Sequence, residues 1–306
     1  MTHQFRGILA LLIVTMVWGT TFPAMKDLTV YFSPVWIIFI RFFIAGVLLL
    51  PFLWSARLRD IRSGVLLGVV LFACYAFQVE GLALTTSNRN AFICGLNVLV
   101  VPLLGVLAGK KPEPRIIVAL ALAVAGLFAL CGDGGGGWGR GDTLALLGAF
   151  AFGCYIKLME AATRHVEKLM TLTAAQIITV ALCSALWLLA RELPPGGAGV
   201  SGLSALSGYL GHIGAGLRIH AMNCLYLGVL CTAAIISLQT WGQRHSTANE
   251  AAVIYAFEPG AAAFFGYFWL GEVLSRQGWL GAALLISGMI VSQWNTERPA
   301  SVLAPE

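Results

Sequence analysis

The sequence predicts an all-α integral membrane protein, with ten transmembrane helices arranged as two inverted five-helix repeats. Three observations favour this fold class. The 306 residues are 58% hydrophobic and only 11% charged, whereas soluble domains carry about 25% charged residues. Apolar runs long enough to cross a bilayer recur along the chain. The second part of the chain also repeats motifs of the first part, which is typical of secondary transporters.

The internal repeat is visible in two pairs of segments. Thr85–Ile93 reads TTSNRNAFI and Ser246–Ile254 reads STANEAAVI, at an offset of 246 − 85 = 161 residues. Nearer the start of each half, Gly7–Phe22 matches Gly141–Ile156 at an offset of 141 − 7 = 134 residues. The difference, 161 − 134 = 27 residues, indicates an insertion in the second half, which we place at 194–217.

The apolar runs set the order of the expected helices. A hydrocarbon core of about 30 Å needs about 20 residues of α-helix. Each half holds five such runs, and an odd number of crossings makes the second half enter the membrane from the opposite side. The ten predicted spans are 6–26, 33–54, 63–84, 89–108, 114–131, 141–161, 171–190, 221–243, 247–270 and 276–294.

These spans define the predicted domain organisation. Residues 1–131 form the first repeat, 132–140 a Gly-rich linker, and 141–296 the second repeat. The insertion at 194–217 is expected to lie on the outer side of the membrane, as a short interfacial helix or as a disordered loop. Residues 297–306 are expected to form a cytoplasmic tail.

The distribution of Lys and Arg predicts the orientation. Cytoplasmic loops are enriched in these residues. They concentrate in the loops that would share a side with both termini, including Arg57, Arg59, Arg62, Lys110 and Lys111. We therefore expect both termini to be cytoplasmic and the protein to lie in the cytoplasmic (inner) membrane.

Polar residues at membrane depth are costly, which makes them candidates for function. Glu258 lies near the middle of the ninth predicted span and precedes Pro259, which removes a backbone donor and loosens the helix. The carboxyl group would either satisfy this break or line a cavity, where it would also be the candidate for proton coupling. Its repeat partner is Asn97, since 258 − 161 = 97.

Arg41 lies within the second predicted span. Its guanidinium suits a substrate carboxylate, but a fixed ion pair with Glu80 is the alternative. The remaining candidates for substrate binding are the repeat-related pair Gln78 and Gln239, since 239 − 78 = 161, and aromatic side chains within spans. Those aromatic candidates are Tyr75, Trp18 and Tyr255.

Several motifs, taken in order, resemble the drug/metabolite transporter superfamily, in its ten-helix EamA-type branch. They are WGTTF at Trp18–Phe22, the second-span Arg41, and the segments Phe77–Gly105, Gly141–Tyr155 and Ser246–Glu272. The resemblance covers nearly the whole chain. One departure is that the first half has Lys110-Lys111 where the second has Gly271-Glu272.

The resemblance implies a carrier with a central cavity and alternating access. Many relatives export amino acids or amino-acid-derived metabolites, so the expected substrate is a small polar organic compound of that kind, with opine-type metallophores included. A multidrug or cationic-compound exporter is the alternative, although residues 7–25 contain no acidic residue. The expected partners are this substrate and the lipid bilayer. Glycine and alanine faces on the fifth and tenth spans leave a homodimer open.

Other classes are disfavoured by the residues that they would need. A membrane-embedded enzyme would need an acidic cluster or paired histidines at membrane depth, and the five histidines all lie in predicted loops or helix ends. The Gly-rich segment at 132–141 lacks the Lys-Ser/Thr of a P-loop. No basic run predicts nucleic-acid binding. We therefore expect no catalytic residues, metal site or cofactor.

Overall fold

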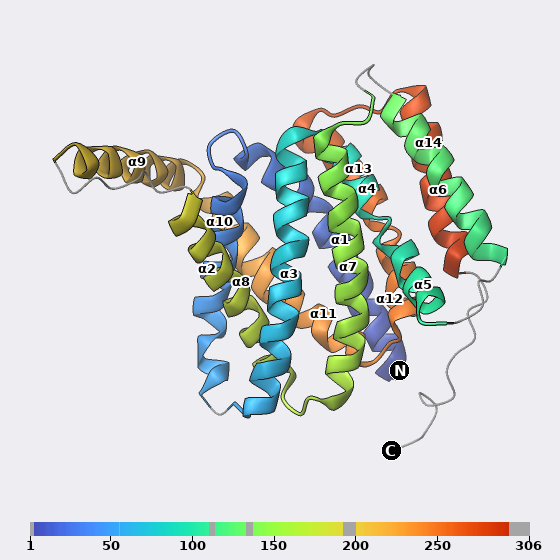
Figure 1. The fold of residues 1–306 in the computed structure, drawn as a ribbon, viewed down its shortest axis with the longest axis horizontal. Coiled ribbons are helices and arrows are strands. Elements are labelled where there is room, and N and C mark those ends of the chain that lie inside the picture. Colours follow the sequence, from blue (N-terminus) through green and yellow to red (C-terminus); the bar gives the residue numbers. More distant parts are fainter. Residues whose placement is uncertain (1–2, 55, 110–113, 133–136, 192–199, 294–306) are drawn as a thin grey trace.

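A computed structural model of the chain describes residues 3–54, 56–109, 114–132, 137–191 and 200–293. Every regular element in these residues is a helix (Figure 1). In order they are α1 (His3–Leu28), α2 (Pro34–Leu49), the 3₁₀ helix η1 (Leu50–Leu53), α3 (Leu58–Leu84), α4 (Ser87–Cys94), α5 (Asn97–Leu107), α6 (Pro114–Gly132), α7 (Arg140–His165), α8 (Leu169–Arg191), α9 (Val200–Ile219), α10 (Ala221–Leu225), the π-helix η2 (Tyr226–Ala234), α11 (Ile235–Arg244), α12 (Ala248–Tyr255), α13 (Glu258–Leu270) and α14 (Arg276–Gln293).

Within the described ranges, eight helical segments are long and apolar enough to cross a membrane. The protein is therefore a multi-pass membrane protein. Eight of the predicted spans overlap these segments, and the other two coincide with α6, whose apolar part Pro114–Leu130 is shorter, and with α14. These two helices pack together at one side of the bundle (Figure 1), where Gly126 and Gly281 allow their backbones to approach closely.

Two predicted spans are interrupted where the sequence predicts continuous helices. The segment 89–108 breaks at Gly95 and Leu96, between α4 and α5, and the segment 247–270 breaks at Ala256 and Phe257, between α12 and α13. The two breaks pack on each other, because a Cβ atom added to Gly95 would lie 2.5 Å from Cγ of Pro259. Each break is followed at once by a site candidate, since α5 begins at Asn97 and α13 begins at Glu258.

The small-residue stripe of the ninth predicted span lies mainly in the interior. Ala248, Ala252 and Ala256 are buried and belong to a core cluster with residues of α1, α5 and α14. Gly260 is different, because nothing lies within 4 Å of the position of its Cβ. The stripe therefore packs through α12 and ends at the helix break.

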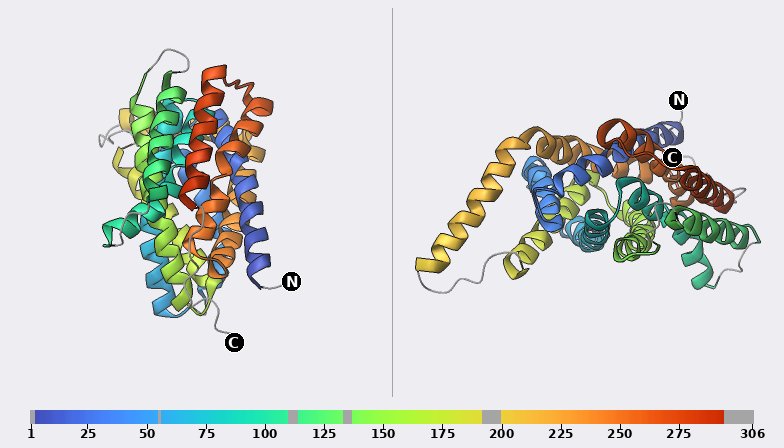
Figure 2. Two further views of the ribbon diagram at one scale, coloured as in Figure 1. Left: turned by 90° about the vertical axis from the view of Figure 1, so that its right-hand side faces the viewer. Right: turned by 90° about the horizontal axis from the view of Figure 1, so that it is seen from above.

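The predicted insertion contains a helix. Within 194–217, residues 194–199 lie outside the described residues, and α9 covers Val200–Ile219. This helix projects from the bundle and runs across the direction of the other helices (Figures 1 and 2). It is attached to α2, where Nε1 of Trp36 donates a hydrogen bond of 2.6 Å to the Tyr209 hydroxyl. The predicted tail, 297–306, and residues 133–136 of the predicted linker lie outside the described residues.

The bundle has two ends, which we name by the elements that meet there. At the terminal end α1 begins and α7 and α11 end; at the distal end α3 and α13 end and α7 begins (Figure 1). Between these ends, α3 packs on α7, α7 on α11, α11 on α1, and α1 on α3.

Candidate functional site

A cavity lies in the middle of the bundle, between α1, α3, α4, α5, α7, α11, α12 and α13. It is bordered by both helix breaks, through Cys94 and Asn97 on one side and Tyr255 and Glu258 on the other. Its lining consists of Trp18, Thr21, Tyr75, Gln78, Cys94, Asn97, Phe152, Tyr155, Ile156, Gln239, Tyr255 and Glu258.

The structure brings together seven of the eight sequence-predicted site residues at this cavity. They are Trp18, Tyr75, Gln78, Asn97, Gln239, Tyr255 and Glu258. Arg41 is the exception, because it does not belong to the lining. The site is thus assembled from residues that lie up to 240 positions apart, since 258 − 18 = 240.

Glu258 supplies a carboxyl group to the cavity. It is the first residue of α13, directly before Pro259, which is well placed there because proline has no N–H to contribute to the first turn. A carboxylate at a helix N-terminus is stabilised by the helix dipole. Among the described residues, Glu258 has no ion-pair partner and no hydrogen-bond partner. The carboxyl group therefore lines the cavity without a cationic side chain paired to it.

Three amide side chains supply further polar groups. Gln78, Asn97 and Gln239 are all buried. Within the described part of the chain, Oε1 of Gln78, Oδ1 of Asn97 and both polar atoms of Gln239 form no hydrogen bond. Gln239 lies beside the Tyr255 hydroxyl, yet the two groups are not oriented to form a hydrogen bond. Because a buried polar atom without a partner is costly, these groups are suited to a polar ligand.

Aromatic rings form much of the remaining wall. The rings of Trp18 and Tyr255 lie 5.6 Å apart between centroids, and Tyr75 packs edge-on against Phe152, also at 5.6 Å. The Tyr155 hydroxyl is held in place because it donates a hydrogen bond of 2.8 Å to Oε1 of Gln176. Nε1 of Trp18 has no hydrogen-bond acceptor among the described residues. The wall is thus apolar and aromatic, with a few polar atoms in it.

Arg41 lies one side chain behind this wall. Its Nε donates to Oγ1 of Thr232 at 2.9 Å, its Nη1 approaches Sδ of Met25 at 3.1 Å, and its Nη2 donates to the Cys231 carbonyl at 3.5 Å. The alternative expectation was an ion pair of Arg41 with Glu80. Among the described residues, the guanidinium of Arg41 does not contact Glu80.

The surroundings of Arg41 explain this position. Thr232 lies in the π-helix η2, whose wider turn lets its hydroxyl also donate to the Leu227 carbonyl five residues earlier. The guanidinium carbon of Arg41 lies 4.7 Å from the centre of the Tyr75 ring, which lines the cavity. Arg41 therefore supports the cavity wall from behind.

The cavity is narrow in this conformation. About 20 Å³ of it admits the centre of a water-sized sphere, which is about the space of one water molecule. Another hollow, of about 640 Å³ on the same measure, lies between α4, α13 and α14 and is lined mainly by apolar residues such as Phe92, Phe264 and Trp279. Binding of an organic molecule in the central cavity therefore requires the surrounding helices or side chains to move.

Polar contacts at the distal end connect different helices. Arg89 of α4 donates to both carboxylate oxygens of Asp142 of α7, at 2.7 and 2.6 Å. Glu272, after α13, accepts hydrogen bonds from the backbone N–H groups of Ser87 and Asn88, at 2.8 and 2.9 Å. Lys26 of α1 donates to carbonyl groups at the end of α3, including that of Leu82 at 2.9 Å.

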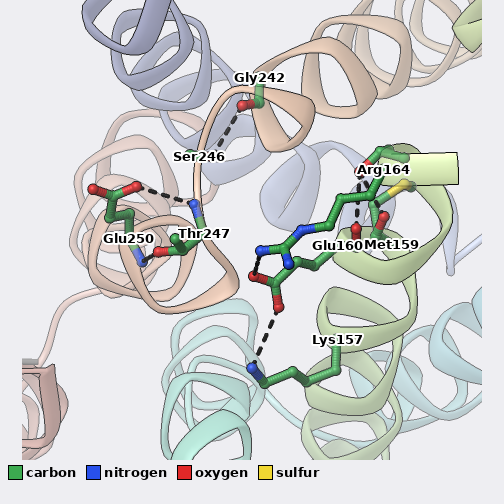
Figure 3. Close-up of polar contacts among 9 residues, drawn as sticks. Lys157, Met159, Glu160, Arg164, Gly242, Ser246, Thr247 and Glu250 are labelled. Carbon is green, nitrogen blue, oxygen red and sulfur yellow. Dashed lines mark hydrogen bonds and ion pairs between the residues drawn. The ribbon is translucent and has the colours of Figure 1, made fainter. Parts of the chain in front are cut away.

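The contacts at the terminal end in Figure 3 remain within single helices and their caps. Glu160 of α7 pairs with Lys157 at 3.4 Å and with Arg164 at 2.9 Å. Thr247 and Glu250 form a capping box at the start of α12, in which the Thr247 hydroxyl accepts from the Glu250 N–H at 3.2 Å and Glu250 accepts from the Thr247 N–H at 3.0 Å.

The sequence analysis did not assign Thr21, Cys94, Phe152, Tyr155 or Ile156 to the site. Four of these residues are related by a repeat offset to another lining residue, either one that the sequence analysis had assigned or one of the four. Phe152 corresponds to Trp18 and Tyr155 to Thr21, since 152 − 18 = 155 − 21 = 134. Likewise, Cys94 corresponds to Tyr255, since 255 − 94 = 161.

With Gln78 and Gln239, and Asn97 and Glu258, the lining therefore contains five pairs of residues related by the repeat offsets. Ten of the twelve lining residues belong to these pairs, and Tyr75 and Ile156 do not. No group of three or more His, Cys, Asp or Glu side chains that could hold a metal ion occurs in the described ranges.

Comparison with known proteins agrees with this architecture. The EamA-like transporter family matches residues 5–131 and 139–293. The chain is 29% identical to an uncharacterized transporter of Archaeoglobus fulgidus, over 92% of this chain and 84% of that protein. It is 26% identical to the uncharacterized transporter YwfM of Bacillus subtilis, over 92% of both chains.

A solved crystal structure shares the fold, with a TM-score of 0.60 and 17% sequence identity, over 92% of this chain and 94% of that one. The family match covers nearly all of the described helices, including every helix that lines the cavity. The chain is therefore a member of the EamA-like transporter family.

Proposed function

We propose that the protein is a secondary transporter that exports a small polar organic metabolite across the cytoplasmic membrane by alternating access. The substrate class is an amino acid or an amino-acid-derived compound, with opine-type metallophores among the candidates. The observation that carries this proposal is the central cavity, whose lining contains five pairs of repeat-related residues. Two of these pairs lie at the breaks of two helices. Binding at interrupted helices between related halves is a general property of secondary transporters.

In this proposal ten helices cross the membrane as two inverted five-helix repeats, residues 1–131 and 141–296, with both termini in the cytoplasm. The pairing of lining residues supports the repeats, because duplicated halves place equivalent residues on opposite sides of one axis. The distal end would then face outward. Glu258 is the candidate for proton coupling, since a carboxyl group that gains and loses a proton can bind substrate and proton alternately.

The decisive test has two steps, the first in cells and the second with the purified protein. Cells that express the wild-type chain or Glu258→Gln at equal membrane abundance are first compared by untargeted analysis of the metabolites in the medium. A compound enriched only by the wild type is then loaded into proteoliposomes, and its counterflow is measured with and without a proton gradient. Glu160→Gln is the matched control, because Glu160 lies at the terminal end and is not part of the lining.

We expect enrichment and counterflow with the wild type and the control, and loss of both with Glu258→Gln. Equal transport by Glu258→Gln would remove Glu258 from the transport cycle. Absence of counterflow for every enriched compound would contradict the transporter assignment.

A further inference from the structure

The electrostatics of the cavity indicate which part of a substrate the protein recognises. Glu258 is the one residue of the lining whose side chain ordinarily carries a charge at neutral pH. The nearest candidate for a positive partner, Arg41, stands behind Tyr75, and its guanidinium already contacts Thr232, Met25 and Cys231. A bound molecule thus meets one carboxyl group and no cationic side chain on the lining.

The aromatic wall favours the same sign of charge. The faces of indole and phenol rings attract cations, and the attraction increases when the cation leaves water. Trp18 and Tyr255 lie close together on the wall, and Tyr255 is three residues before Glu258. Tyr75 already has one cationic group near its ring, since the Arg41 guanidinium lies 4.7 Å from the ring centre. An ammonium group in the cavity would therefore meet a carboxyl group and aromatic rings on one lining.

The free hydrogen-bond acceptors complete this environment. An ammonium group has three donors and no acceptor. Glu258, Oδ1 of Asn97 and Oε1 of Gln78 are acceptors on the lining, and the two amide oxygens have no partner among the described residues. A substrate carboxylate would instead be brought near the Glu258 carboxylate in a space from which water is largely excluded, and like charges repel strongly there.

We propose that the cavity recognises the ammonium group of small organic amines and does not require a carboxylate on the substrate. This inference rests on the proposed transport function and makes it more specific. The compounds preferred by the site are amines whose carboxylate is absent or masked, for example a decarboxylated amino acid. The corresponding amino acid binds more weakly, and the corresponding acid without an amino group is excluded.

The test is binding of matched compounds to the full-length protein in lipid nanodiscs, measured by calorimetry and by thermal stabilisation. The probes are phenylalanine, phenethylamine and 3-phenylpropionate, together with leucine, isoamylamine and 4-methylpentanoate. We expect each amine to bind about tenfold or more tightly than its amino acid, and the acids not to bind. Glu258→Gln should weaken amine binding about tenfold or more, with Glu160→Gln unchanged.

A gain-of-function variant makes the test independent of the stability of Glu258→Gln. Asn97→Asp places a second carboxylate at the position related to Glu258 by the repeat. We expect it to increase the affinity for a diamine such as putrescine relative to isoamylamine. Unchanged relative affinity in Asn97→Asp, or unchanged amine binding in Glu258→Gln, contradicts the proposal. Two further outcomes would overturn it. One is that the amino acids bind more tightly than the amines and that this preference is lost in Arg41→Met. The other is that no amine binds.

These outcomes are separable from those of the transport test. Binding of amines without counterflow would retain the ammonium site and remove the transporter assignment. Counterflow of an amino acid that depends on Arg41 would retain the transporter assignment and remove the ammonium site.

Discussion

The helices α4 and α12 begin in the same way but are held differently. Thr86 and Thr247 are their N-caps and correspond in the repeat, since 247 − 86 = 161. Three residues later, Glu250 completes a capping box within α12, whereas the corresponding Arg89 pairs with Asp142 of α7. The N-terminus of α4 receives its acidic partner from Glu272, after α13.

This difference separates the two ends of the bundle. At the distal end, an ion pair connects α4 with α7, and hydrogen bonds to Glu272 connect α4 with the end of α13, so helices must lose polar contacts to separate there. At the terminal end, the contacts in Figure 3 lie within α7, at the end of α11 or at the start of α12. The contacts of Arg57 with Glu167 and of Asp60 with the Lys168 N–H join the start of α3 to the segment between α7 and α8, and not to α11 or α12. We therefore expect the distal end to be the more firmly closed in this conformation, and the terminal end to open at lower cost.

The largest effect is expected from Asp142→Asn. Asp142 is almost completely buried and neutralises Arg89, and removing one partner of a buried ion pair costs about 3–5 kcal/mol. Distal opening should therefore increase. The measurement is the labelling rate of Cys94, which lines the cavity, by a membrane-impermeant maleimide added to each side of oriented vesicles, with Cys94→Ser as background. Asp142→Glu is the charge-preserving control, and an unchanged distal labelling rate in Asp142→Asn would contradict the comparison.

A smaller shift in the same direction is expected from Glu272→Gln. The carboxylate accepts two backbone N–H bonds at the start of α4, and a hydrogen bond to a charged group contributes about 1.5–3 kcal/mol. The amide retains one acceptor oxygen, so part of the contact survives. Distal labelling of Cys94 should rise, but less than in Asp142→Asn. A greater rise of Cys94 labelling from the terminal side would show that Glu272 does not hold the distal end closed.

Thr247→Ala should affect stability without affecting access. Loss of an N-cap hydroxyl costs about 1 kcal/mol, and this contact lies within the start of α12. We expect a lower midpoint of thermal unfolding in detergent and the same ratio of distal to terminal Cys94 labelling as in the wild type. The matched substitution Thr86→Ala, at the start of α4, should by contrast change that ratio, because α4 carries the distal contacts.

Glu160→Gln should have the smallest effect. Its partners Lys157 and Arg164 are partly exposed and belong to the same helix, and such pairs contribute about 0.2–1 kcal/mol. The thermal midpoint and the labelling ratio should both remain close to those of the wild type. A clear increase of terminal labelling would show that this cluster holds helices together, and would remove the distinction between the ends.

Sequence reasoning located much of the candidate site because the repeat offset identifies pairs without any structure. Glu258 directed attention to Asn97, and Gln78 to Gln239, and all four lie at the cavity. The position of Arg41 behind Tyr75 was not predictable, because it depends on Thr232, 191 residues away, and on a π-helical turn. A hydropathy pattern records burial but not which neighbour covers a charged group.

The helix breaks were also difficult to predict. The run around Gly95 is apolar apart from Asn97, so hydropathy alone favours one helix through it. Pro259 gave a local reason for a break in the ninth span, whereas the first-half break becomes understandable once Gly95 is seen to accommodate Pro259. Likewise, the contact of Glu272 with α4 joins residues 185 positions apart.

The contact between Gly95 and Pro259 has a consequence for the kinetics of transport. Because the bend of one long segment rests on the bend of the other, neither can straighten without changing the space available to its counterpart. We infer that the two bends act as one pivot. Conformations in which only one half of the protein has moved would then be short-lived. A carrier of this kind would be protected against leak, since an intermediate open to both sides of the membrane requires the halves to move independently. Enlarging Gly95 would therefore be expected to slow turnover by fixing the pivot, even where the cavity still binds its ligand.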